Sequence, residues 1–156
     1  MSREFRQLVV ETKGLFGRRQ SAPAPARPQR VRVPNASSQH EVDVPGFHGT
    51  PKKIKGRHLR TSRTPSLPEP NGVSFGTNPK TARQFGKHVY RARLRGRIGD
   101  AETFMARARE HMANGHSAGD ASKKTQREFE RRGYHGVRWG QREIAMFKPT
   151  RVRPHK

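Results

Sequence analysis

Apolar and polar residues alternate along residues 88–95, in the pattern of a β-strand that is buried on one side only. The apolar face of this segment would hold Tyr90, Ala92 and Leu94. The opposite face would hold Arg91, Arg93 and Arg95. Because successive side chains of a strand point to opposite faces, we expect the arginines to form a solvated cationic surface over a small core.

A second alternating segment, GYHGVRWGQREIAMFKPTRV at residues 133–152, predicts a β-hairpin. Its first strand would be 137–139, followed by a turn at Gly140 and a second strand over about 141–147. One face of the second strand would hold Ile144 and Met146, and the other Glu143, Ala145 and Phe147. A carboxylate on an apolar face costs free energy unless a polar group binds it, so Glu143 is a candidate functional residue. In the alternative interpretation, the strand begins at Ile144 and Glu143 belongs to a hydrated turn.

Between FHGT (residues 47–50) and the arginine-rich strand, the sequence has clear signals for where a strand and a helix begin. A short strand is expected over 73–75, after which Asn78 can cap a helix whose first residue is Pro79. Ala82 and Phe85 are spaced to share one face of that helix.

Two longer helices are expected further along the chain. Asp100 can cap the first, over about 101–113, and its inner face would hold Ala101, Phe104, Met105, Ala108 and Met112. The second, over 121–132, is more polar, with Phe129 as its main apolar anchor. Strands and helices of this kind in one domain predict an α+β fold.

The N-terminal third has a different character. Residues 3–13 can form a short amphipathic helix within a first unit of 1–17. Residues 18–45 are rich in Pro, Ala and Arg and predict an extended linker, although Val42 and Val44 could begin a strand. The folded domain is therefore expected over 46–156.

Composition narrows the classes of function. The chain has 156 residues, no cysteine, and 29% hydrophobic residues, so we expect a small core without disulfides. No apolar run approaches the ~20 residues of a membrane span, and the N-terminus lacks a secretory signal, so we expect no membrane partner. The net charge is +22, and a folded part this basic should attract polyanions, with nucleic acid the leading candidate.

A long basic loop is expected over 51–72, directly after FHGT. Its only acid is Glu69, against six cations that could contact nucleic acid or an acceptor: Lys52, Lys53, Lys55, Arg57, Arg60 and Arg63.

Other common sites are not indicated. The eight histidines show no tight ligand spacing, so we predict no metal site. The sequence has neither the phosphate-binding loop of nucleotide triphosphatases nor a strand-linked dinucleotide fingerprint.

Three separated segments resemble the ADP-ribosyltransferase fold: 47–50 (FHGT), 72–85 (GVSFGTNPKTARQF) and 140–152 (GQREIAMFKPTRV). They occur in the family's order, across about residues 42–153. The resemblance is to the His–Tyr–Glu branch, which includes diphtheria toxin and the poly-ADP-ribose polymerases, and to the small domains of bacteriophage polyvalent proteins. It implies a small split β-sheet with flanking short helices, preceded here by a basic, Pro-rich N-terminal tail.

The resemblance also implies roles for individual residues. His48 matches the histidine that hydrogen-bonds the adenosine ribose of NAD, and Gly49 matches the residue whose backbone holds the nicotinamide carboxamide. Thr50 is the usual neighbour with a small hydroxyl group. Phe85 matches an aromatic residue against nicotinamide, and Glu143 matches the catalytic glutamate.

One position departs from the family pattern. Ser74 stands where the family has its tyrosine, while Phe75 keeps the following aromatic residue. Serine cannot stack on nicotinamide, so Phe85 would have to supply that face alone. Gln141 and Glu143 resemble the Gln-x-Glu pair of arginine-modifying transferases, and residues so spaced on a strand share a face.

The implied function is mono-ADP-ribosyl transfer from NAD, without a metal, to a host protein or nucleic acid. Cleavage of the nicotinamide–ribose bond builds positive charge on the ribose, which a carboxylate near the 2-hydroxyl stabilises. The resemblance implies a phage or bacterial origin and action in the host cytoplasm, with carriage in a virion as one route. Two alternatives remain open: an inactive ADP-ribosyltransferase fold, and an unrelated basic nucleic-acid-binding or virion protein.

Overall fold

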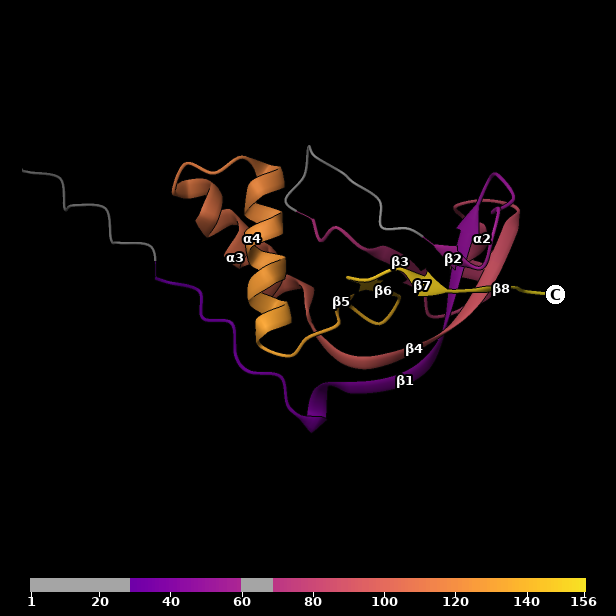
Figure 1. The fold of residues 1–156 in the computed structure, drawn as a ribbon, viewed down its shortest axis with the longest axis horizontal. Coiled ribbons are helices and arrows are strands. Elements are labelled where there is room, and N and C mark those ends of the chain that lie inside the picture. The colour runs from indigo at the N-terminus through magenta and orange to yellow at the C-terminus, as the bar shows by residue number, and fades with distance from the viewer. Residues whose placement is uncertain (1–28, 60–68) are drawn as a thin grey trace, which may run out of the picture.

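The computed structural model describes residues 29–59 and 69–156 and combines a sheet-based core with helices, which confirms the α+β class (Figure 1). The helix expected over 3–13 lies outside these residues, as do Arg60 and Arg63 of the basic loop. Within the described ranges, no helix has both the length and the apolar character that crossing a membrane requires.

Five strands close into a barrel-like sheet. In order of neighbours they are β1 (Glu41–Thr50), β3 (Val73–Gly76), β6 (Glu143–Met146), β5 (Gly136–Trp139) and β4 (His88–Asp100). β4 then pairs with β1 along the whole of β1, from Glu41↔Arg97 to Thr50↔His88, and so completes the ring. The resemblance implied a small split β-sheet, whereas the long β1–β4 pairing closes these five strands into one barrel-like sheet.

Short strands extend this arrangement. β8 (Arg153–Pro154) pairs with the first part of β4 through Arg91↔Arg153, along the edge of β4 that does not pair with β1. β2 (His58–Leu59) and β7 (Thr150–Arg151) form a separate two-stranded ladder. The C-terminal residues therefore lie along the barrel, beside the long strands (Figure 1).

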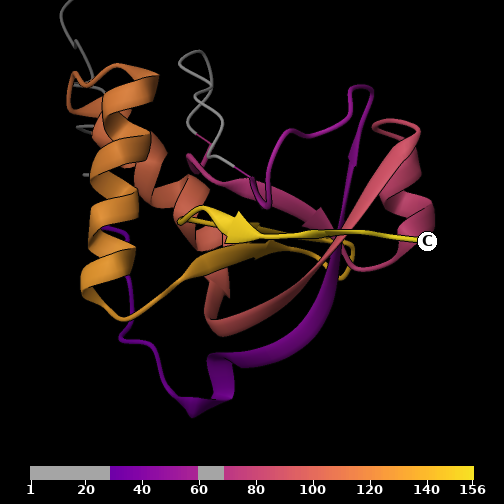
Figure 2. The ribbon, with the colours of Figure 1, turned by 45° about the vertical axis from the view of Figure 1, so that its right-hand side comes forward.

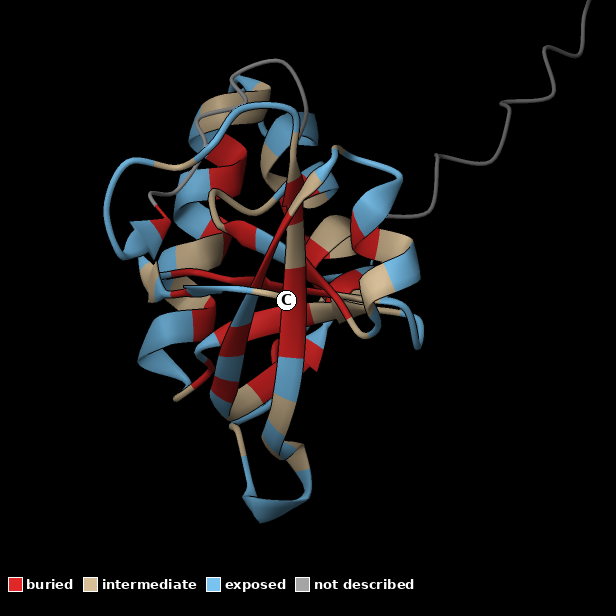
Figure 3. Cartoon of the chain, turned by 90° about the vertical axis from the view of Figure 1, so that its right-hand side faces the viewer, coloured by how far each residue is buried: buried red, intermediate tan, exposed pale blue. Residues whose placement is uncertain are grey.

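Alternate side chains of the strands fill the barrel. The most completely buried residues of its interior are Phe75, Leu94 and Ile144. On β4 the buried positions alternate with exposed Arg91, Arg93 and Arg95, as the sequence predicted, and the colour alternation of the long strands is visible in Figure 3. On β6, Ile144 and Met146 face this interior.

A second apolar core lies outside the barrel, under two helices. α3 (Ala101–Ala113) and α4 (Ala118–Arg131) form the crossover that the parallel pairing of β4 with β5 requires, and they lie together at one side of the barrel (Figure 2). The Oδ2 atom of Asp100 accepts a hydrogen bond from the Thr103 amide at 2.7 Å, which confirms the predicted cap of α3. Beneath the helices, the rings of Phe104 and Phe129 lie 5.2 Å apart.

The short helix α2 (Pro79–Arg83) packs at the opposite end of the barrel from α3 and α4 (Figure 1). Asn78 caps it, accepting a hydrogen bond from the Thr81 amide at 2.8 Å. Gly49 of β1 passes so close to α2 that a Cβ atom there would overlap the backbone carbonyl of Ala82. Only glycine therefore fits at this point of β1.

The described part of the expected linker is packed against the helices. Val33 is buried, the Val31 amide donates to Glu110 of α3 at 2.9 Å, and the Ala36 amide donates to the Arg132 carbonyl at 2.8 Å. Local composition predicted only an extended chain here, because these hydrogen bonds join residues that are far apart in the sequence. The folded unit thus begins well before residue 46, and β1 itself begins at Glu41.

Candidate active site

Three of the residues that the resemblance assigns to NAD chemistry lie on neighbouring strands. His48 belongs to β1, Ser74 to β3 and Glu143 to β6, and the sheet order places these strands side by side. Ser74 and Ala145 are directly paired across β3 and β6, and Glu143 pairs with Gly76. Segments nearly a hundred residues apart in sequence thus meet on one part of the barrel wall.

A pocket of about 290 Å³ opens on that wall. Its lining residues are Glu69, Pro70, Ser74, Trp139, Glu143 and Ala145. Two of the predicted site residues, Ser74 and Glu143, are therefore brought together in one concave site, on the outside of the barrel.

Glu143 is the first residue of β6 and is half-buried. It pairs with Trp139 of β5 on one side and Gly76 of β3 on the other, so it belongs to the sheet and not to a hydrated turn. Among the residues that the structure describes, no side chain or backbone amide hydrogen-bonds its carboxylate, and no cation pairs with it. In a chain with 34 lysines and arginines, a half-buried carboxylate without a cation is an unusual arrangement.

His48 is joined to the same wall but does not line the pocket, because it shares a face with Gly46 and Tyr90, toward the barrel interior. Its Nδ1 atom lies 2.9 Å from the carbonyl oxygen of Ser74, and its ring meets that of Phe75 edge-on at 6.0 Å. Because a carbonyl only accepts, Nδ1 is the donor, and in neutral His48 the other ring nitrogen, Nε2, is an acceptor. No partner for Nε2 is found within 29–59 and 69–156.

The two residues after His48 have clear structural roles. Gly49 allows β1 to pass α2, as described above. Thr50 ends β1, and its hydroxyl donates to the Lys52 carbonyl at 3.1 Å, which turns the chain into the basic loop.

Three other predicted site residues lie elsewhere. Phe75 is fully buried in the barrel, which leaves no face of its ring for a ligand. Phe85 is 62% exposed and outside the pocket, because α2 ends at Arg83 and its apolar face does not extend that far. Gln141 lies in the β5–β6 turn, where its carbonyl accepts from the Thr77 hydroxyl at 3.0 Å, so the strand alternation used to pair it with Glu143 does not apply.

Two lining residues were missed at the sequence level. Trp139 is directly opposite Glu143 in the hairpin, and counting back from Gly140 would have found it. Glu69 is placed by tertiary structure alone, since its carbonyl accepts a hydrogen bond from the Ser122 hydroxyl of α4. No local pattern signals that contact.

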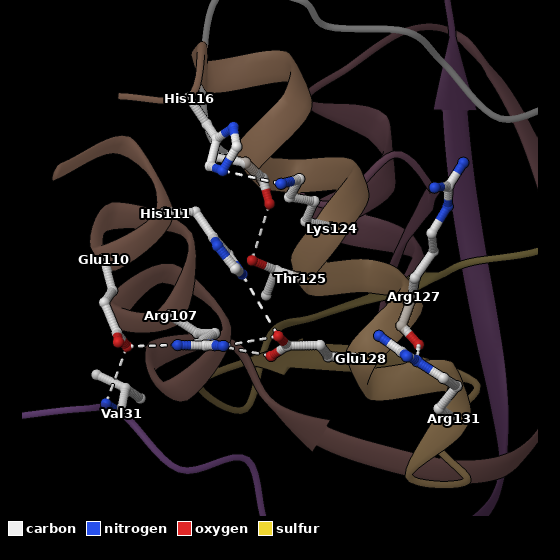
Figure 4. A network of polar contacts seen from close by, with 11 residues as sticks. Val31, Arg107, Glu110, His111, His116, Lys124, Thr125, Arg127, Glu128 and Arg131 are labelled. Carbon is white, nitrogen blue, oxygen red and sulfur yellow. Dashed lines mark hydrogen bonds and ion pairs between the residues drawn. The ribbon is translucent and has the colours of Figure 1, made fainter. Parts of the chain in front are cut away.

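A different group of charges holds the helices together (Figure 4). Buried Arg107 of α3 makes two hydrogen bonds of 2.7 Å to the carboxylate of Glu128 on α4 and pairs with Glu110 at 2.7 Å. The guanidinium of Arg107 lowers the pKa of both carboxyl groups below their ordinary value, chiefly through these hydrogen bonds. Burial lowers the pKa of the neighbouring His111.

The loop after Thr50 carries its cations into solvent. The described ones, Lys52, Lys53, Lys55 and Arg57, are all exposed. Within the described ranges, no three His, Asp or Glu side chains gather closely enough to hold a metal ion.

Comparisons with family models, curated proteins and solved structures gave no match for this chain. The arguments for function therefore rest on the residues and their geometry.

Proposed function

We propose that this protein is an NAD-dependent mono-ADP-ribosyltransferase with an ADP-ribosyltransferase-like fold, acting on a macromolecule of its host. The observation that carries the proposal is the carboxylate of Glu143, which is half-buried in a pocket beside Ser74 and Trp139 and has no partner among the described residues. The strand order adds support, because Ser74 and Glu143 lie on adjacent strands and line one pocket, while His48 is on the next strand with its side chain toward the barrel interior.

The chemistry assigned to Glu143 is electrostatic. The bond between the nicotinamide nitrogen and C1′ of its ribose breaks, and nicotinamide leaves with the bonding electron pair. Glu143 accepts a hydrogen bond from the 2′-hydroxyl of that ribose and stabilises the positive charge that develops on the ring. A nucleophilic atom of the acceptor then bonds to C1′ and releases its proton to solvent. A neighbouring cation would oppose this role by neutralising Glu143, and none is found among the described residues.

His48 is assigned to ribose recognition. Its Nδ1–H is held by the Ser74 carbonyl, so the neutral ring offers Nε2 as a hydrogen-bond acceptor. A ribose hydroxyl is a donor of the right kind. The link to Ser74 also fixes the orientation of the ring relative to strand β3.

Trp139 is assigned the aromatic face that Ser74 cannot provide. It lines the same pocket as Ser74 and lies opposite Glu143, whereas Phe85 is outside the pocket. The pocket volume of about 290 Å³ is just below the range for sites that hold a whole small molecule, roughly 300–1,000 Å³. It therefore suits the nicotinamide–ribose end of NAD, with the rest of the dinucleotide outside.

The decisive experiment follows label from NAD. The wild-type protein is incubated with NAD labelled on its adenylate phosphate, with and without a bacterial lysate, and transfer and hydrolysis are measured. Glu143→Gln should lower turnover by ~10²-fold or more, the scale of one preorganised electrostatic group. The control is Glu102→Gln, which removes an exposed acid in the first turn of α3 and should leave turnover unchanged.

Different results would refute the role of Glu143 and the enzyme activity itself. Near-wild-type turnover in Glu143→Gln would refute the role of this carboxylate. Absence of both NAD binding and turnover in the wild type would refute the enzyme and leave an inactive fold or a basic nucleic-acid-binding protein. Trp139→Ala should raise the KM for NAD more than it lowers kcat, since stacking binds the ground state as well.

A further inference from the structure

A groove of about 830 Å³ lies on the outer face of β1 and β4, beside the C-terminal residues that pair with β4. Basic side chains dominate its lining: Arg91, Arg93, Arg151, Arg153, His155 and Lys156. We propose that this groove binds the sugar-phosphate backbone of a nucleic acid. It shares no lining residue with the pocket around Glu143, so it would be a second and separate site.

Most cations of the groove are available to a ligand. Within the described residues, no acid pairs with Arg91, Arg151, Arg153 or Lys156, and all of these side chains are exposed. The one acid among the described lining residues is Asp43, which holds Arg93 through hydrogen bonds of 2.5 and 2.8 Å and accepts another from Arg95 at 3.2 Å. The groove therefore has a clear excess of positive charge.

Strand geometry spaces the arginines of β4 regularly, although Asp43 holds two of them, Arg93 and Arg95. Arg91, Arg93 and Arg95 project from the same face of β4, at intervals of two residues, or about 6.6 Å. Arg153 is in register with Arg91 on the adjacent strand β8, which doubles the row at that point. An extended row of guanidinium groups fits a chain of successive phosphates better than it fits a single anion.

The number of cations in the groove and its few apolar residues indicate which polyanion it binds. A dinucleotide such as NAD carries only two phosphates, fewer than could be bound by the four cations that have no acid partner among the described residues. Acidic protein surfaces bind through buried aromatic or aliphatic anchors, but the uncharged part of this lining is Pro45, Ala92 and Pro154. With no aromatic platform among the groove-lining residues apart from the His155 ring, binding should depend on backbone phosphates and not on base sequence.

The test measures binding of fluorescently labelled DNA as a function of salt concentration, for a duplex and for the corresponding single strand. The groove variant replaces Arg91, Arg151, Arg153 and Lys156 with Ser. Each phosphate that the variant no longer binds should reduce the slope of log affinity against log salt by about 0.9 on duplex DNA and about 0.7 on single strands. The comparison of the two DNA forms shows which one the groove accommodates.

A matched control removes the same charges elsewhere. It replaces Arg83, Arg109, Arg127 and Lys123, which are exposed and lie on α2, α3 and α4, with Ser. The groove variant should lose at least about tenfold more affinity than the control at the same salt concentration, while its hydrolysis of NAD without acceptor stays at the wild-type rate. Equal losses in the two variants would refute the groove and indicate a diffuse field of charge.

A variant with stronger expected binding protects the test against misfolding. Asp43→Asn removes the one acid among the described lining residues and frees Arg93 and Arg95. It should tighten DNA binding and steepen the salt slope, by about 0.9 for each additional phosphate that it binds on duplex DNA. Unchanged or weaker binding in Asp43→Asn would refute the proposal, as would wild-type protein that binds an acidic polypeptide such as poly-glutamate but not DNA.

Discussion

Glu128 and Glu143 are both half-buried glutamates, but only Glu128 has a cation beside its carboxylate among the described residues. Glu128, between α3 and α4, receives two hydrogen bonds from Arg107, and its pKa is lowered in consequence (Figure 4). Glu143, on the barrel wall, has no cation or hydrogen-bond donor among the described residues. Lysine and arginine are abundant in this chain, so the lack of a partner is specific to the place and not to composition.

Under the proposed function, the difference separates a structural charge from a reactive one. An acid that is needed only for stability gains from a buried guanidinium, which offsets the cost of removing it from water. The same partner would hinder an acid that must stabilise a transient positive charge, because the guanidinium already neutralises the carboxylate. The two regions can therefore be tested against each other by mutation.

The largest effect is expected from Arg107→Met. This change leaves Glu128 and Glu110 without their cation, and breaking a buried pair costs about 3–5 kcal/mol. The variant should show a loss of this size in the free energy of unfolding, measured by urea denaturation. Arg109→Met is the control, since Arg109 is exposed on the same helix. A loss no greater than that of the control would show that the helices do not depend on the network.

The next largest effect is a difference between the wild type and Arg107→Met in how the free energy of unfolding depends on pH. Arg107 lowers the folded-state pKa of Glu110 and Glu128, so their contribution to stability is present above the unfolded pKa of about 4.3. It is lost as the pH falls through the lower, folded values. In Arg107→Met both acids lose the group that chiefly lowers their pKa, so this loss becomes smaller.

His111 acts in the same direction in the wild type. Burial lowers its pKa, so protonation favours the unfolded chain, and stability falls as the pH drops below the ordinary histidine value of about 6.5. Urea midpoints measured from pH 7 to pH 3 should therefore decline in the wild type. The gap between the wild type and Arg107→Met should narrow toward acid pH, and a constant gap would contradict the assigned pKa shifts.

The sequence predicted local structure well because that structure is encoded locally. Alternation identified β4 and the β5–β6 hairpin, and the caps at Asn78 and Asp100 placed the starts of α2 and α3. These signals depend on residues within a few positions of one another.

The long-range features could not be read in this way. The β1–β4 pairing that closes the barrel and the packing of Val33 under the helices depend on contacts between distant segments. Arg107 was not foreseen as a buried residue, because its burial depends on Glu128, which is 21 positions away. At the candidate site the sequence indicated Glu143 and Ser74, whereas Trp139 needed the hairpin register and Glu69 needed the contact with α4.

The smallest effect on stability is expected from Glu143→Gln, and it sharpens the comparison most. The substitution keeps the shape of the side chain, removes a half-buried charge that has no cation among the described residues, and breaks no ion pair there. The free energy of unfolding should therefore stay within about 0.5 kcal/mol of the wild-type value or rise slightly. The same variant should lose ~10²-fold of NAD turnover. A charge whose removal is harmless to folding but severe for turnover is held in place for chemistry. A loss of stability comparable to that of Arg107→Met would instead show that Glu143 has a structural partner, and would place it in the same class as Glu128.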